Sequence, residues 1–194
     1  MGNTQNGRTG MSLVTLQDVQ GLTPIPNSVP WNEIERYFDE AEWHDVRPFL
    51  NECGEDFWYI FTNNITDAKY QSLLNGTTYT NSQGNTVEFR GLKPAIVHYG
   101  YARYIEHGQL FATRSGMRMK IGDDSEPVGA KRLQYLASKE RNDAYTYAQQ
   151  AIDFLEDSDD YDWTRSKTPR TGLNMTSIAG NAQKRPRVRR ISNE

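Results

Sequence analysis

Cysteine is almost absent from this chain, because Cys53 is the only one among 194 residues. An internal disulfide and a zinc site built from cysteines are therefore excluded. A chain without disulfides is typical of a reducing compartment. A lone cysteine can act as a nucleophile, but no neighbouring residue in the sequence suggests activation of this thiol. We interpret Cys53 as a buried or incidental residue.

Long apolar runs are also missing. No stretch approaches the about 20 apolar residues that a transmembrane helix needs, and the first 16 residues lack the apolar centre of a signal peptide. Apolar residues make up only 36% of the chain, but 4 Trp, 11 Tyr and 7 Phe supply large surfaces for a core. We therefore expect a compact body with polar extensions and no contact with a membrane.

The usual signatures of enzymes are absent as well. The chain contains no GxxxxGK[ST], GxGxxG or GxSxG pattern. Its three histidines, His44, His98 and His107, all fall on predicted helices, and the last two are nine residues apart, which turns them toward different faces of one helix. We interpret them as core or surface histidines and predict no enzymatic activity, no catalytic residue, no cofactor and no metal site.

Charge is distributed unevenly along the chain. The net charge is −3, yet residues 164–194 hold eight Lys or Arg and one acid, so they carry +7 and residues 1–163 carry −10. The acids are densest in EDSDDYDW (156–163), which lacks the glycine and the distal glutamate of an EF-hand loop. We interpret this stretch as a solvated helix end, with weak cation binding as the alternative.

The basic tail has three readings: an arm that binds phosphate, a nuclear localisation signal, or a peptide that folds on an acidic partner. We favour docking on a partner protein, with DNA second. The predicted docking residues are Lys184, Arg185, Arg187, Arg189 and Arg190. A smaller basic group around Gly116, formed by Arg114, Arg118 and Lys120, is predicted to contact phosphate or a partner's anionic surface, with a solvated loop as the alternative.

Hydrophobic periodicity predicts a mainly α fold: a small helical bundle with one β-hairpin and a long C-terminal helix, flanked by extended N- and C-terminal arms. Spacings of three and four between apolar residues, and caps or glycines at the ends, set the elements. We expect helices at 31–44, 67–75, 92–108 and 128–157, two short helical pieces around Gly54, a hairpin at about 77–90, and extended structure or a loop with a turn at Gly116.

Three parts follow from this pattern. Residues 1–30 are rich in Gly, Asn, Thr and Gln and are predicted to be an extended N-terminal arm, in which MSLVTLQDV could dock on a neighbour. Residues 31–157 form the helical domain. Residues 158–194 are predicted to be an acidic, then basic, extended tail.

The helical domain resembles the head–tail connector (adaptor or ring) proteins of tailed bacteriophages, and most of all those of crAss-like and other Bacteroidetes phages. The resemblance covers about residues 31–157. It rests on the order and spacing of five segments: IERYFDEAEWHDVRPFL, FWYIF, GNTVEFRGLKPAIVHYGYARYIEHG, ATRSGMRMK and DSEPVG. The arms outside this range are not covered.

The resemblance implies a structural virion protein. Such proteins form a ring, in this case with twelve copies expected, that joins the capsid portal to neighbouring tail or ring proteins. Viral DNA passes through the lumen without specific binding. We therefore expect the protein at the head–tail junction of a virion, and in the host cytoplasm during assembly. The alternative is a nucleic-acid-associated regulatory protein whose basic C-terminal arm binds DNA.

Overall fold

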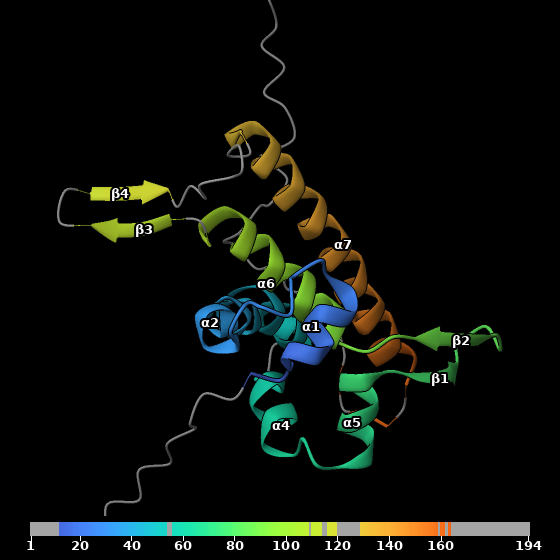
Figure 1. Ribbon diagram of the computed structural model, residues 1–194. Helices are drawn as coiled ribbons and strands as arrows, with labels where there is room; N and C mark the ends of the chain where they lie inside the picture. Colours follow the sequence, from blue (N-terminus) through green and yellow to red (C-terminus); the bar gives the residue numbers. More distant parts are fainter. Residues whose placement is uncertain are drawn as a thin grey trace, which may run out of the picture.

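The computed structural model describes residues 12–53, 56–108, 110–113, 116–119, 129–158, 160–161 and 163. Most of these residues are helical, and two short hairpins lie beside the helices (Figure 1). The predicted fold class, mainly α with a hairpin and a long C-terminal helix, is confirmed.

The elements follow one another in this order along the chain. They are α1 (Leu16–Leu22), α2 (Trp31–Ala41), the π-helical turn η1 (Glu42–Val46), α3 (Arg47–Leu50), the 3-10 turn η2 (Asn51–Cys53), α4 (Phe57–Asn63), α5 (Ala68–Asn75), β1 (Thr77–Thr80), β2 (Thr86–Phe89), α6 (Lys93–His107), β3 (Leu110–Thr113), β4 (Gly116–Met119) and α7 (Ala130–Asp157).

Helix α6 lies at the centre of the molecule, and α7 packs antiparallel along one side of it (Figure 1). Their contact is lined by small side chains, which lets the two backbones approach closely. On α7 these are Ala137, Ala144, Ala148 and Ala151, and on α6 they are Ala95 and Ala102, all of which are buried. At the lower end of the pair larger side chains take over, where Phe154 of α7 stacks on Phe89 with ring centroids 4.5 Å apart.

Helix α2 packs across α6, and a glycine permits this contact. A Cβ atom on Gly100 would overlap the ring of Phe38, which is fully buried. The chain then continues from α2 through η1 into α3 without leaving helical geometry. Pro48 is the second residue of α3 and follows directly on the π-helical turn η1, where the pattern of helical hydrogen bonds changes.

Residues 12–30 correct the prediction of an extended N-terminal arm. They contain α1, which begins with a capping box between Thr15 and Asp18. Val19 is fully buried, and Lys93 at the start of α6 donates to Asp18 at 3.1 Å. The prediction failed because composition is a poor guide where a few apolar residues find a tertiary partner. Residues 1–11 lie outside the described part of the chain.

The predicted C-terminal boundary also needs correction. Tyr161 and Trp163 are 6% and 4% exposed, so the core continues past the end of α7. The Trp163 indole N–H donates to the carbonyl oxygen of Leu50 at 2.7 Å, and the Tyr161 hydroxyl donates to the carbonyl of Lys69. Both aromatics lie among acidic residues in the sequence, which is why this stretch was predicted to be a solvated helix end. Residues 164–194 lie outside the described part.

The predicted hairpin is present, with β1 and β2 antiparallel and Thr77 opposite Phe89. Gly76 precedes the hairpin and Gly91 follows it, and both have positive φ angles in the region that favours glycine. A Cβ atom on Gly76 would overlap the backbone just before Gly91, and a Cβ atom on Gly91 would overlap the backbone at and just before Gly76. The segment expected to be extended or a loop with a turn at Gly116 forms a second antiparallel pair, β3–β4, in which Gly116 is the first residue of β4.

Candidate functional site

Most of the site residues predicted from the sequence lie outside the described structure. This holds for the five basic tail residues and for Arg114 and Lys120. Arg118 lies on β4, in the hairpin that projects from the body near the end of α6 (Figure 1). Their roles in binding a partner or phosphate therefore stay predictions.

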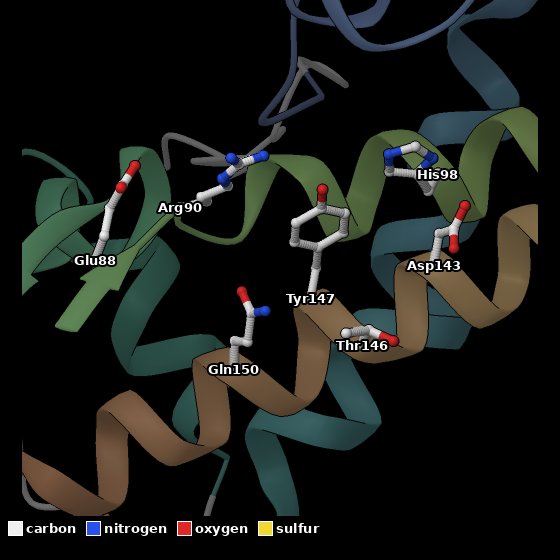
Figure 2. A pocket seen from close by; sticks show the side chains of 7 residues that line it. All are labelled: Glu88, Arg90, His98, Asp143, Thr146, Tyr147 and Gln150. Atoms are coloured by element: carbon white, nitrogen blue, oxygen red, sulfur yellow. The ribbon is translucent and has the colours of Figure 1, made fainter.

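The structure instead shows an open cavity of about 510 Å³ where β2, α6 and α7 meet. Its lining is polar and charged and consists of Glu88, Arg90, His98, Asp143, Thr146, Tyr147 and Gln150. Figure 2 shows Glu88 and Arg90 at one end of the cavity and His98 with Asp143 at the other, with Tyr147 between them.

His98 is held in place by two residues of α7. Its ring nitrogen Nδ1 lies 2.7 Å from Oε2 of Glu140, and the two side chains are only 13% and 15% exposed. The ring of Tyr147 stacks on the imidazole, with centroids 5.5 Å apart and planes 11° from parallel. The orientation of His98 is therefore fixed by a hydrogen bond in its plane and by an aromatic ring against its face.

A third possible ligand lies beside this pair. One ligand atom each from His98, Glu140 and Asp143 can be chosen so that all three lie within 4.8 Å of one another. Figure 2 shows the Asp143 carboxylate pointing toward the His98 ring. The sequence analysis predicted no metal site, because it looked for cysteines, for histidines on one helix and for an acidic loop, and not for one histidine and two carboxylates on two helices. The available signal was the Glu-x-x-Asp spacing at 140 and 143, which places two carboxylates on one face of a helix.

The charges around the cavity are partly balanced. Lys139 lies 3.9 Å from Asp143, one turn away on the same helix. Burial raises the pKa of the Tyr101 hydroxyl, and the negative charge of Glu140 adds to the rise. The Thr146 hydroxyl donates to the carbonyl of Asn142, so it is occupied within its own helix.

A second feature with functional meaning is a set of exposed aromatic side chains. Among the side chains that the structure describes, four aromatics are half exposed or more: Trp43 of η1, Tyr59 of α4, and Tyr135 and Tyr145 of α7. Arg47 lies over the Trp43 ring at 4.7 Å, and Arg132 over the Tyr135 ring at 5.5 Å. Aromatic residues and arginine are the types enriched at protein–protein interfaces.

The model of a protein family described as a family of unknown function, DUF6712, matches residues 46–172. The chain belongs to this family. No curated protein and no solved structure matches the chain. Among the described residues, no helix is long and apolar enough to cross a membrane.

The DUF6712 match includes the whole cavity and the residues His98, Glu140 and Asp143. It begins at the last residue of η1, so α1 and α2 lie before it although both pack on α6. The described helical body is therefore larger than the family match at its N-terminal side.

Proposed function

We propose that the protein is a structural virion subunit that forms a ring at the portal vertex of a tailed bacteriophage. The ring joins the capsid portal to the tail and surrounds the DNA channel. The resemblance over residues 31–157 supports this proposal. The segments that carry it begin in α2 and end at Gly129, directly before α7.

The observation that carries the proposal is the placement of exposed aromatics on separate parts of the body. Tyr59 is 66% exposed on α4, at the lower end of the molecule in Figure 1, and Tyr135 is 61% exposed in the first turns of α7, at the upper end. A ring is built from heterologous contacts, so each subunit needs two different contact surfaces. Buried aromatics carry much of the energy of such contacts.

The shape of the subunit also suits a ring. Figure 1 shows the two hairpins projecting from opposite sides of the helical body. Projecting hairpins reach neighbouring subunits without enlarging the core. The charge of −10 on residues 1–163 suits a channel through which DNA slides, if acidic residues face the lumen. A solved assembly with a lumen lined by Lys and Arg would contradict this orientation.

The basic tail is proposed to dock on an acidic protein neighbour, through Lys184, Arg185, Arg187, Arg189 and Arg190. The chain cut after Trp163 keeps every buried residue of the described core. We therefore expect deletion of residues 164–194 to leave the body folded and to weaken its assembly with the portal.

Native mass spectrometry tests the proposal directly. The full chain is measured alone and mixed with a candidate portal protein. We expect a closed ring of about twelve copies on the portal, and we expect Tyr59→Ser and Tyr135→Ser together to weaken it. Lys139→Ser is the matched control, since this exposed residue lies one turn beyond Tyr135. A chain that stays monomeric or dimeric and ignores the portal would contradict the proposal.

The net charge of +7 on residues 164–194 favours a second candidate, a nucleic-acid-associated regulatory protein. An arm that clamps DNA neutralises several phosphates, so its affinity falls steeply with salt concentration. A DNA titration at several salt concentrations separates the two functions. A steep slope that disappears with the tail would support the regulatory protein, and a weak, shallow dependence would support the ring subunit.

A further inference from the structure

We infer that the side chains of His98, Glu140 and Asp143 bind one divalent transition-metal ion, with Zn²⁺ as the best fit. The ligands come from two packed helices. His98 is on α6, and the two carboxylates are three residues apart on α7. All three belong to one chain, so the site does not depend on the proposed ring.

The spacing of the ligand atoms is close to what a metal ion needs. Zn²⁺ binds imidazole nitrogen and carboxylate oxygen at about 2.0–2.2 Å, so two ligand atoms at a tetrahedral angle lie about 3.3 Å apart. The His98 and Glu140 atoms are 2.7 Å apart, joined by a hydrogen bond. A metal ion replaces the shared proton, and the pair opens by roughly half an ångström when it does so.

Asp143 can complete the group by rotating its side chain. Its ligand atom lies within 4.8 Å of the other two, and its side chain is 46% exposed, so packing does not fix it. Its contact with Lys139 is long, at 3.9 Å, and is half exposed on both sides, so breaking it costs little. The two carboxylates repel each other across one helical turn, and a cation between them removes this repulsion.

The surroundings orient His98 and leave a path for an ion. Tyr147 covers one face of His98 and holds the imidazole plane in the direction of α7. Arg141, the charged residue between the two carboxylates in sequence, is held away by a bidentate pair with Glu106. His98 and Asp143 line the end of the open cavity, which leaves an entry path and room for a water as fourth ligand (Figure 2).

The donor set selects the class of metal. One imidazole nitrogen and two carboxylate oxygens suit Zn²⁺, Mn²⁺ and Fe²⁺, whereas Ca²⁺ and Mg²⁺ prefer oxygen ligands alone. Zn²⁺ tolerates a tetrahedral group of three protein ligands and one water. The ion would cross-link α6 to α7, so its expected effect is stabilisation of the helix pair that forms the core.

The test uses the full chain, stripped with chelator, and titrates it with Zn²⁺ and with Mg²⁺ by calorimetry and thermal melting. We expect one Zn²⁺ per chain, a raised melting temperature, and much weaker binding of Mg²⁺. Asp143→Asn and Glu140→Gln should each lower the Zn²⁺ affinity about tenfold or more. Glu88→Gln is the matched control, since Glu88 is a carboxylate at the other end of the same cavity, and it should bind Zn²⁺ like the unmodified chain.

Asp143→Asn is the decisive variant, because this isosteric change at a half-exposed position leaves the fold intact. Co²⁺ can replace Zn²⁺ in a second measurement, because Co²⁺ bound in a tetrahedral site with nitrogen and oxygen donors absorbs visible light. The absorption spectrum then reports on the geometry of the ligands. Two results would overturn the inference. One is the absence of saturable Zn²⁺ binding, and the other is Zn²⁺ binding that Asp143→Asn leaves unchanged.

Discussion

Helix α7 consists of two segments that share the same helical geometry but differ in how far their side chains are buried. The packed segment, residues 137–157, buries Leu155 and Phe154 and the alanines that face α6. The leading segment, residues 130–136, buries no side chain, although Leu133 and Leu136 lie on the apolar face of the same helix. At 1.5 Å per residue the 15 residues of α6 span about 22 Å and the 28 residues of α7 about 42 Å. Helix α7 therefore reaches beyond the helix on which it packs.

This difference in burial distinguishes the side chains that stabilise the subunit from those that are available to contact another chain. Among the described residues, the apolar face of the leading segment is only partly covered, which favours a contact with another chain. The leading segment also carries the exposed Tyr135 with Arg132 over its ring. In the proposed ring, the packed segment sets the stability of the subunit and the leading segment contributes to its assembly.

The sharpest test of the packed end is Trp163→Ala, which should lower the free energy of unfolding by about 3–5 kcal/mol, because it empties a site that is 4% exposed. Urea unfolding followed by circular dichroism measures the loss. Trp163→Phe is the control. It keeps most of the apolar burial but leaves the carbonyl of Leu50 without the indole donor, at a cost of about 1–3 kcal/mol. A change below 1 kcal/mol for the alanine variant would show that the core ends with α7.

A matched pair of leucines compares the two segments of α7 directly. Leu155→Ala, at a position that is 1% exposed, should cost about 2–5 kcal/mol, because it leaves a cavity in the core. Leu133→Ala in the leading segment should cost less than about 1 kcal/mol in the isolated subunit. Both are read from urea unfolding. Equal losses of unfolding free energy at the two positions would show that both segments of α7 are packed in the core. Normal ring assembly by the Leu133→Ala variant would contradict the proposed role of the leading segment.

The alanine contact with α6 gives a third comparison. Ala148→Leu should cost about 1–3 kcal/mol, because Ala148 is 1% exposed and a larger side chain forces the two helices apart. The control is Ser138→Leu, at an exposed position of α7, which should alter the free energy of unfolding by no more than about 0.5 kcal/mol. If Ala148→Leu were harmless as well, the helix pair would be looser than the structure shows, and thermal melting of the two variants would reveal it.

The smallest expected effect on stability comes from the ion pair between Glu106, near the C-terminal end of α6, and Arg141 of α7. The guanidinium of Arg141 donates to both carboxylate oxygens of Glu106 and so lowers the pKa of that carboxyl below its ordinary value of 4.5. A lowered pKa in the folded state stabilises the protein above the unfolded pKa, and this contribution is lost as the pH falls through the folded pKa. Because Arg141 is 41% exposed, the contribution should stay below about 1 kcal/mol.

Glu106→Gln isolates this contribution. The difference in unfolding free energy between the original chain and the variant should be constant above about pH 5 and shrink as the pH falls below the ordinary value. Urea unfolding at a series of pH values measures it. A difference that grows toward low pH would mean that the pair does not stabilise the folded state.

Much of the fold could be predicted from local pattern. The ends of α5, α6 and the first hairpin were predicted to within a few residues, because Gly76 and Gly108 stop helices and the Thr-rich stretches alternate. The docking of α1 and the burial of Trp163 could not, because each depends on a partner far away in the sequence, such as Leu50, which lies 113 residues before Trp163.

The candidate metal group shows the same limit. The sequence places Glu140 and Asp143 on one helical face, but only folding brings His98 to them from 42 residues away. The roles of the basic tail and of Arg114, Arg118 and Lys120 stay predictions, since nearly all of these residues lie outside the described structure.

The sequence by itself determined the element types, because hydrophobic period and glycine position act within a few residues of the chain. It also determined the separation of an acidic body from a basic tail. Only the tertiary structure decided which apolar residues are covered and which charged residues meet. The reason is physical: burial and ligand geometry depend on distances between segments, and those distances are set when α6 and α7 pack, not by either helix alone.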